Sequence, residues 1–158
     1  MNRTSKKHIA TLVPSLRPIA KQFLKLATGS LVLYDKPWST YTVEITEGKR
    51  DIMWQAGLYS QGRRWQSMAR RWVIHDANKI VTDTIMGSNH LQGLAFDIAL
   101  WNPSNGHYIW PNPRQRHQEK AKKAKKLWLN LAGIGRQLGL NPGADWRHQD
   151  FPHYEVEL

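Results

Sequence analysis

The feature that most constrains the fold is a long amphipathic segment in the last third of the chain. Between residues 116 and 138, apolar side chains recur at helical spacing and lysines occupy the flanks of the stripe. The stripe consists of Ala121, Ala124, Leu127, Trp128, Leu131, Ile134 and Leu138. Gly139 is a natural end for this helix. A helix of this kind must bury its stripe, so the rest of the chain has to supply an apolar surface.

Two more helices are predicted upstream. Residues 15–28 place apolar side chains at helical spacing, with Ser15 as a candidate N-cap. Asp51 can cap a short helix that stops near Gly62. Residues 63–78 are irregular and basic, and we expect a loop or a short surface helix there.

Alternation of apolar and polar residues predicts the strands. The pattern occurs at residues 41–46 and at the C-terminal end over 153–158, and residues 93–101 also have strand character. Turn-forming residues at 102–106 predict a hairpin that returns through 108–110. Helices mixed with strands that are joined mainly by turns indicate an α+β fold, with a small antiparallel sheet packed against helices.

Size and composition limit the class of protein. A chain of 158 residues and 18.3 kDa fits a single domain over residues 1–158. It contains no cysteine, which excludes disulfides, thiolate metal sites and cysteine nucleophiles, so any metal must be bound by histidine and carboxylate. The net charge of +11 favours a polyanionic partner such as nucleic acid, an anionic envelope polymer or a membrane surface.

The chain has no apolar run that approaches the roughly 20 residues of a membrane span. Its first residues are basic but lack the apolar core of a secretory signal. We therefore expect synthesis in the cytoplasm without a signal peptide.

Two distant motifs carry the candidate chemistry. The first contains His90 and Asp97 on either side of Gly93, and the second is Asp150-Phe151-Pro152-His153. Zinc hydrolases commonly use three protein ligands, leave a fourth position for water and place a carboxylate nearby as general base. Two imidazoles and two carboxylates are enough for one zinc ion and one base. Either motif alone is a weak signal, and their combination carries the prediction.

The wider pattern resembles a known family. It comprises Ser88-x-His90-x2-Gly93-x-Ala95-x-Asp97, Gly143-Ala144-Asp145-Trp146, Asp150-x-Pro152-His153-Tyr154-Glu155, and upstream Thr46 to Arg50, Gln55 and Val81 to Thr84. This set is similar to the zinc D-alanyl-D-alanine carboxypeptidase/L-alanyl-D-glutamate endopeptidase family (peptidase M15-like), especially its phage endolysin branch. The resemblance implies a Hedgehog/DD-peptidase-like fold, with the N-terminal helix at about 15–28 followed by a catalytic core over about 40–158.

The resemblance also implies roles for individual residues. His90, Asp97 and His153 would bind one Zn²⁺ ion, and Asp150 would be the catalytic base. This assignment separates the two carboxylates into one ligand and one base.

Three further residues have less specific implied roles. Arg50 would act in catalysis and substrate binding by holding a substrate carboxylate or the developing oxyanion. Ser88 would contact the substrate or simply form a turn. Gln55 would contribute to substrate binding, orient Arg50 or pack on its helix.

The implied activity is hydrolysis of the peptidoglycan stem peptide. An aspartate at position 150 favours the L-alanyl-D-glutamate bond, and removal of terminal D-alanine by a DD-carboxypeptidase is the rival within the family. The implied setting is a monomeric endolysin that reaches the cell wall after release by a membrane-permeabilising partner, while its basic surface gathers it on the anionic cell envelope. Two departures from the family pattern are a longer, more basic segment at 63–79 and Ala144 where glycine is common.

A nucleic-acid-binding module without catalysis is the alternative from another class. Arg and Lys interleave with Trp65, Trp72 and Trp128, although Trp128 lies on the apolar stripe and is expected in the core. The charge does not require the His-Asp-His pattern, so we expect no stable nucleic-acid partner. Of the other histidines, His148 could replace a ligand but is expected to be exposed. Surface positions are expected for His8, His75, His107 and His117.

Overall fold

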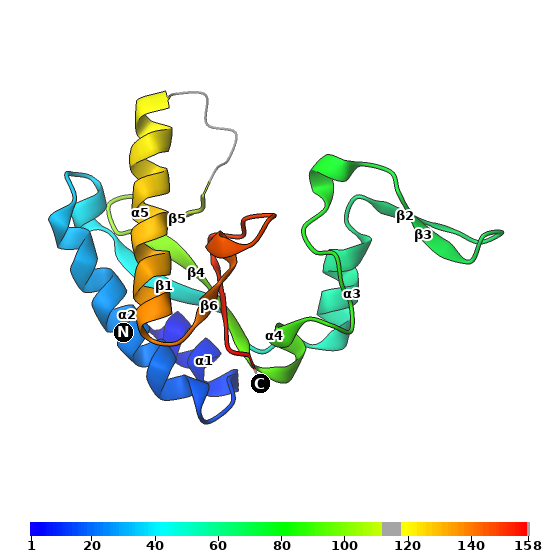
Figure 1. Ribbon diagram of the computed structural model, residues 1–158, viewed down its shortest axis with the longest axis horizontal. Helices are drawn as coiled ribbons and strands as arrows, with labels where there is room; N and C mark the ends of the chain where they lie inside the picture. The colour runs from blue at the N-terminus through cyan, green and yellow to red at the C-terminus, as the bar shows by residue number, and fades with distance from the viewer. Residues whose placement is uncertain (112–117, 158) are drawn as a thin grey trace.

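The computed structural model describes residues 1–111 and 118–157, with side chains described for 1–111 and 122–157. Its centre is an antiparallel sheet with the strand order β1-β4-β7-β6, and β5 pairs with the far end of β4 (Figure 1). These strands are β1 (Thr42–Glu47), β4 (Ala95–Asn102), β5 (His107–Ile109), β6 (Asn141–Pro142) and β7 (His153–Glu155). The arrangement confirms the predicted α+β class.

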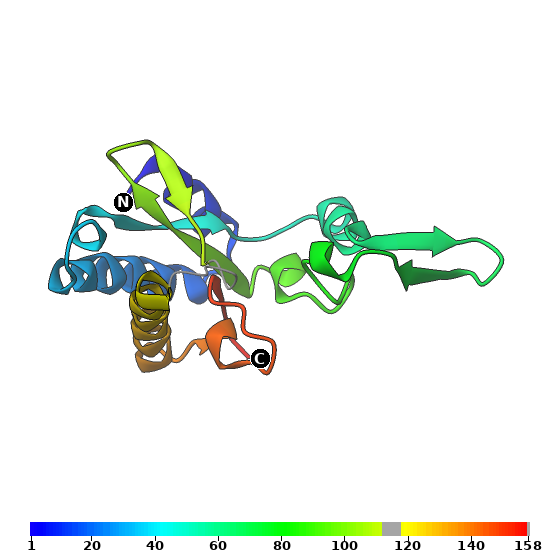
Figure 2. The ribbon, with the colours of Figure 1, turned by 90° about the horizontal axis from the view of Figure 1, so that it is seen from above.

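Three helices pack around this sheet. They are α1 (Arg3–Thr11), α2 (Leu16–Ser30) and α5 (Gln118–Gln137). Helices α2 and α5 lie side by side, and α1 lies against β1 (Figures 1 and 2). The described part of the predicted α5 stripe faces inward, since Leu127 and Leu131 are fully buried and Trp128 is 2% exposed, whereas the Ala121 side chain lies outside the described residues. Among the described residues, no helix combines the length and apolar character needed to span a membrane.

An aromatic cluster joins α2 to the strands that carry both motifs. The rings of Phe23 and Tyr154 have centroids 4.6 Å apart, and those of Phe96 and Tyr154 are stacked at 5.6 Å. All three side chains are fully buried. Because Phe96 precedes Asp97 and Tyr154 follows His153, this cluster fixes the backbone at the point where the motifs meet.

Shorter elements complete the chain. They are η1 (Leu31–Leu33), η2 (Trp38–Thr40), α3 (Ile52–Ser60), β2 (Arg63–Gln66), β3 (Arg71–Ile74), η3 (Ala77–Lys79), α4 (Asn89–Gln92) and η4 (Gly143–Asp145). Asp51 caps α3 as predicted, because its Oδ1 accepts a hydrogen bond from the Trp54 N–H at 2.8 Å. Ser15 occupies the N-cap position of α2, as predicted, but its side chain makes no capping hydrogen bond.

The prediction of a loop or surface helix at 63–78 was wrong. Strands β2 and β3 form an antiparallel hairpin, in which Trp65 pairs with Trp72 across the strands. This hairpin projects away from the rest of the molecule (Figures 1 and 2). Its turn includes Arg70, whose φ of 47° lies in the left-handed region. The cross-strand pair of Trp65 and Trp72 stabilises a hairpin that the sequence pattern does not predict.

Helix α1 was not predicted either. Asn2 caps it by accepting a hydrogen bond from the Ser5 N–H at 2.8 Å. Within the helix only Ser5 and Ile9 are buried, so its apolar stripe is too narrow to stand out. The helix is nevertheless bound to the sheet, because Ser5 Oγ accepts the Ile45 N–H at 3.0 Å.

Candidate metal centre

The two motifs meet because their strands are neighbours. Asp97 in β4 is directly opposite His153 in β7, although the two residues are far apart in sequence. His90 lies on the single turn of α4, which ends at Gly93 with φ of 73°. The left-handed turn at Gly93 leads the chain directly into β4. Sheet register and one glycine turn therefore place three potential ligands together.

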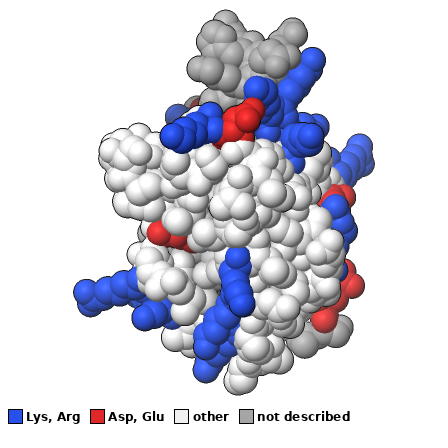
Figure 3. All heavy atoms as spheres, turned by 90° about the vertical axis from the view of Figure 1, so that its left-hand side faces the viewer, with Lys and Arg blue, Asp and Glu red and all other residues white. Residues whose placement is uncertain are grey.

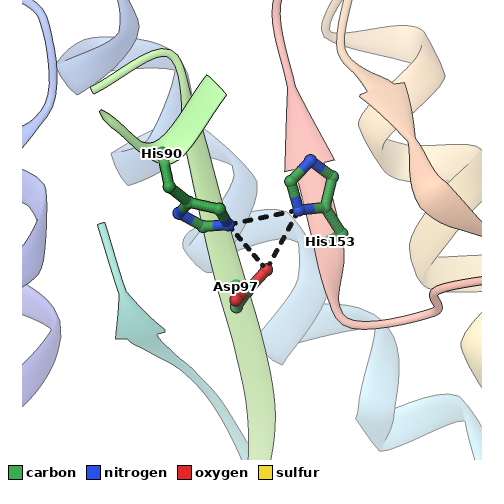
Figure 4. A group of neighbouring side chains, drawn as sticks. All are labelled: His90, Asp97 and His153. Carbon is green, nitrogen blue, oxygen red and sulfur yellow. Dashed lines mark hydrogen bonds and ion pairs between the residues drawn. The ribbon is translucent and has the colours of Figure 1, made fainter. Parts of the chain in front are cut away.

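The geometry is compact (Figure 4). His90 Nε2 lies 3.2 Å from His153 Nδ1. Asp97 Oδ1 lies 3.3 Å from His90 Nε2 and 3.2 Å from His153 Nδ1. One ligand atom from each residue therefore lies within 4.8 Å of the others, and these residues form a group that could hold a metal ion. His90 is 3% and His153 is 7% exposed, whereas the Asp97 side chain is 19% exposed. The group is thus largely buried, and Asp97 is its most exposed member.

The outer nitrogen of each imidazole contacts an oxygen that orients the ring. His90 Nδ1 lies 2.8 Å from the Gly48 carbonyl, which can only accept, so the proton belongs on Nδ1 and Nε2 keeps its lone pair. His153 Nε2 lies 2.9 Å from Glu155 Oε2, which leaves Nδ1 to face the centre. Such partners fix the tautomer and the direction of metal-binding histidines. With both rings in the neutral form, each would offer a lone pair to the same point.

Helix α1 supports this arrangement from behind. A Cβ on Gly48 would lie 2.5 Å from the His8 carbonyl oxygen, and a Cβ on Gly93 would lie 3.0 Å from that of Thr11. The Val13 N–H also donates to the Gly93 carbonyl at 3.0 Å. Both glycines are therefore required by the close approach of the N-terminal segment, which fixes the carbonyl that orients His90.

Electrostatics hold the centre in a charged state. Burial opposes ionisation of Asp97, but the two imidazoles outweigh it and hold the pKa of this carboxyl well below its ordinary value. Burial likewise disfavours the charged form of His153, yet hydrogen bonds to Asp97 and Glu155 raise its pKa to about 9. The hydrogen bond to His153 lowers the pKa of Glu155. In the absence of metal, a proton on His153 therefore balances these carboxylates.

Arg50 is buried beside the centre. It is 8% exposed, and its guanidinium makes a bidentate ion pair with Glu47 at 2.9 and 2.6 Å. Nη2 also lies 3.4 Å from Asp97 Oδ2, and Nη1 donates to Gln55 Oε1 at 2.5 Å. Burial lowers the pKa of Arg50, but the acidic neighbours outweigh it and raise the pKa above its ordinary value. The structure thus presents Arg50 as a support for the Asp97 carboxylate.

Gln55 and Ser88 occupy different environments. Gln55 is fully buried, and its amide also donates to the Thr84 carbonyl at 2.7 Å. Its contact with Arg50 agrees with the expectation that Gln55 orients this residue, and a contact of Gln55 with substrate stays a prediction. Ser88 is half-buried at the start of α4 and makes no capping bond. A substrate contact by Ser88 stays a prediction.

Asp150 approaches the centre from the loop before β7. Its N–H donates to the Gly143 carbonyl at 2.9 Å, and its own carbonyl accepts the His153 N–H at 3.1 Å. The side chain is partly open to solvent and lines a pocket of about 580 Å³ together with Trp110 and Phe151. Surrounding protein and the negative charge of Asp97 raise the pKa of Asp150, against the nearby positive groups. It therefore lies within electrostatic reach of the ligand group.

Three contributors were not assigned a role from the sequence. Glu155 lies two residues after His153, and strand alternation could have identified it as a neighbour on the same face. Glu47 faces Arg50 after a register shift between Ile45 and Glu47, and no sequence signal reports that shift. Trp146, whose ring centroid is 4.8 Å from that of His153, is part of the quoted motif.

The remaining histidines lie elsewhere. His75, His107 and His148 are exposed, as expected. His8 is half-buried rather than on the surface, because α1 packs against the β1 end, and burial lowers its pKa. His117 lies outside the described residues.

A buried His-Asp-His group on an antiparallel sheet, with a carboxylate nearby, is the kind of site that metallopeptidases use. Comparisons with known proteins identify the family. The sequence model of a family described as D-alanyl-D-alanine carboxypeptidase matches residues 82–156. The peptidoglycan L-alanyl-D-glutamate endopeptidase CwlK of Bacillus subtilis (strain 168) is 35% identical over 150 residues, which cover 91% of this chain and 75% of that protein. The chain therefore belongs to the M15 family of metallopeptidases.

A solved structure supports the fold. The crystal structure of the Serratia marcescens L-Ala D-Glu endopeptidase ChiX aligns with a TM-score of 0.54 and 17% sequence identity, covering 99% of this chain and 89% of that one. This similarity confirms the predicted α+β architecture of the family.

Proposed function

We propose that the protein is a zinc-dependent peptidase that hydrolyses the L-alanyl-D-glutamate bond of the peptidoglycan stem peptide. The convergence of His90, Asp97 and His153 within 4.8 Å, with Asp150 beside them, carries the proposal. Family membership supports a peptidase, and the name of the Bacillus relative supports this bond.

The donor set fits one zinc ion. Two neutral imidazole nitrogens and one carboxylate oxygen are common ligands of catalytic zinc, which keeps a further position open. The ring nitrogens His90 Nε2 and His153 Nδ1 face each other, and the opposite nitrogen of each ring is already engaged. A bound zinc ion would supply Lewis-acid activation of water and of the scissile carbonyl.

We assign proton transfer to Asp150. Its carboxylate would take a proton from the attacking water and pass it to the amine that leaves as the peptide bond breaks. A raised pKa suits this role, because the group both accepts and returns the proton. Partial exposure to the pocket leaves the carboxylate accessible to a peptide.

We assign a positioning role to Arg50. Its guanidinium is held by Glu47 and Gln55, and it reaches Asp97 Oδ2 while remaining buried. The remaining carboxylate oxygen, Asp97 Oδ1, then faces both histidines. This geometry favours an Arg50 that fixes the ligand over one that grips a substrate carboxylate.

The experiment that tests the proposal uses a defined muropeptide and mass spectrometry. Separation between L-alanine and D-glutamate is expected, and it should stop after treatment with a chelator and return with zinc. Loss of one terminal alanine would instead support a DD-carboxypeptidase. No cleavage of either bond by the zinc-loaded protein would contradict both activities.

We further propose a role as a phage endolysin, which rests on the resemblance of the two motifs to that branch. Co-expression in bacteria with a membrane-permeabilising protein should cause lysis. Co-expression of the Asp97→Ala variant should not. Equal lysis by both would show that the peptidase does not contribute.

A further inference from the structure

The β2–β3 hairpin forms a projecting arm, here defined as residues 63–74. Its base is firmly attached, since Arg63 Nη1 donates to the Tyr59 and Thr82 carbonyls at 2.7 and 2.9 Å and Nη2 lies 3.0 Å from Asp83. The Arg63 guanidinium also stacks 4.0 Å above the Tyr59 ring. His75 and Asp76 then donate from their N–H groups to the Gly62 carbonyl. The arm is therefore an anchored extension of α3 and the following segment.

The arm exposes large apolar side chains. Met68 at the turn is 99% exposed, Ile74 64%, Trp65 48% and Trp72 37%. Trp65 and Trp72 share one face of the hairpin, with ring centroids 5.7 Å apart and rings inclined at 67°. Contiguous apolar surface of this kind commonly marks a site of interaction with a protein or a membrane.

The same arm carries unpaired positive charge. Its sequence contains four arginines and no acidic residue. Three of them, Arg64, Arg70 and Arg71, are exposed and take part in none of the ion pairs formed within the described part of the chain. A guanidinium binds phosphate oxygens through two parallel hydrogen bonds and is weakly hydrated. The arm therefore combines phosphate-binding groups with apolar ones.

Basic residues elsewhere are arranged differently. On the face that Figure 3 shows, several Lys and Arg side chains gather near the top with an acidic group among them, and others stand apart lower down. Lys122, Lys125 and Lys126 on α5 are exposed, yet no comparable aromatic pair lies on that helix, where Trp128 is buried. Net charge alone thus does not distinguish the arm, whereas the combination of arginine with exposed Trp and Met does.

We propose that the arm binds the surface of a bilayer rich in anionic phospholipids. Tryptophan prefers the boundary between headgroups and acyl chains, arginine attracts lipid phosphates, and Met68 can enter the apolar layer at the tip. A glycan strand is less suitable, because the inclined Trp65 and Trp72 rings do not form a flat platform. Nucleic acid would use the arginines but offers nothing to Met68 or Ile74.

This assignment goes beyond the proposed peptidase function and does not depend on it. None of the residues in the metal centre belongs to the arm. A protein held through the arm would therefore keep Asp150 and the ligand group free for substrate.

Vesicle co-sedimentation of the full chain tests the proposal. The probes are vesicles of phosphatidylglycerol with phosphatidylethanolamine, and vesicles of phosphatidylcholine alone. The arm variant Arg64→Gln/Arg70→Gln/Arg71→Gln is compared with the matched variant Lys122→Gln/Lys125→Gln/Lys126→Gln, which loses the same charge from α5. Met68→Ser serves as a second arm variant that cannot disturb folding, since this side chain is almost fully exposed.

We expect the wild type to bind anionic vesicles and not neutral ones. The arm variant should lose affinity by on the order of 100-fold, because each arginine near an anionic surface contributes about fivefold. The α5 variant should lose only a few-fold, and Met68→Ser should bind measurably less than the wild type. Muropeptide hydrolysis by all variants should equal that of the wild type, so a failure of the peptidase assay is distinguishable from a failure of vesicle binding.

Several results would overturn the proposal. These are equal losses in the arm and α5 variants, wild-type binding to neutral vesicles as tight as to anionic ones, and no vesicle binding at all. Tighter binding of the wild type to duplex DNA or to purified peptidoglycan, lost in the arm variant, would assign the arm to that polymer instead.

Discussion

The metal centre and the arm differ in which groups they bury: the centre buries polar side chains that have partners, and the arm exposes apolar side chains and charges without partners. In the centre, the ring nitrogens of His90 and His153 are buried and each faces an oxygen or another ring nitrogen. In the arm, Trp65 and Met68 are exposed, and three of its four arginines, all but Arg63, have no acidic partner in the described structure. Buried polar groups need such partners, because an unsatisfied one is costly.

The difference indicates where each region makes its interactions. The centre is organised within the chain and is ready to receive a small charged ligand. The arm is supported only at its base, so its exposed groups are available to something outside the chain. The predictions below test whether activity and stability reside in the first region while surface binding resides in the second.

The largest expected effect is on catalysis in the centre. Asp150→Asn should lower kcat by about 10²–10⁴-fold, because the amide cannot accept a proton. The protein should still bind one zinc ion, which metal analysis of the purified variant measures. Normal turnover would show that Asp150 is not the base, and loss of metal together with activity would show that Asp150 takes part in metal binding.

The same variant should not lose stability at neutral pH. Because the pKa of Asp150 is raised in the folded state, its ionisation costs stability as pH rises between its unfolded and folded values. Asparagine carries no charge and removes that cost, so the melting temperature at pH 7 should stay the same or increase. The wild-type activity should correspondingly fall as pH is lowered through the raised pKa.

The next largest effect is expected on stability, where a substitution in the core beside the metal centre should cost more than one in the arm. Phe96→Ala should reduce the free energy of unfolding by about 3–5 kcal/mol, because it opens a cavity between Phe23 and Tyr154 next to Asp97. Denaturant titration of the metal-free protein measures this loss. A loss as small as that of an arm variant would mean that the aromatic cluster does not support the centre.

Much of the central architecture was predictable from the sequence. The stripe of α5 and the alternation of β1 were recognisable because burial of one face leaves a periodic pattern, and the two motifs were recognisable from side chains that can bind a metal. Asp97 and His153 were expected to converge, but their direct pairing across β4 and β7 is a matter of long-range register. The register shift that brings Glu47 to Arg50 leaves no pattern in the local sequence. The contact through which Arg50 holds Asp97 could therefore not be predicted.

The arm and α1 were not predictable for a related reason. Both faces of the arm are exposed, so selection for burial leaves no alternation, and the Arg-Arg-Trp-Gln sequence of β2 lacks a strand pattern. Helix α1 buries only Ser5 and Ile9, and its contribution is backbone contact with Gly48 and Gly93 rather than an apolar stripe. Sequence patterns report burial, and they miss structure that is stabilised by hydrogen bonds or by pairs on the surface.

A smaller effect is expected from the residue that orients His153. Glu155→Gln should weaken zinc binding by about 10–100-fold, because the carboxylate fixes and polarises the imidazole. The matched control is Glu157→Gln, which removes an exposed carboxylate two residues further along. Competition with a chromophoric chelator measures both affinities. Equal affinities in the two variants would show that Glu155 has no special role.

Zinc affinity should also depend on pH in a defined direction. Since the pKa of His153 is raised to about 9 in the metal-free protein, the metal must displace a proton at neutral pH. Affinity should therefore rise by about tenfold per pH unit between pH 7 and 8 and level off near pH 9. A pH-independent affinity over this range would mean that His153 is already neutral.

The smallest effect on stability is expected in the arm. Trp65→Ala should reduce the free energy of unfolding by no more than about 1.5 kcal/mol, because it removes one edge-to-face pair from a largely exposed hairpin. Denaturant titration beside Phe96→Ala gives the comparison directly. Peptidase activity should be unchanged, because the metal centre contains no residue of the arm. A loss as large as that of Phe96→Ala would show that the arm is part of the folding core, and its exposed tryptophans would then need no external partner to explain them.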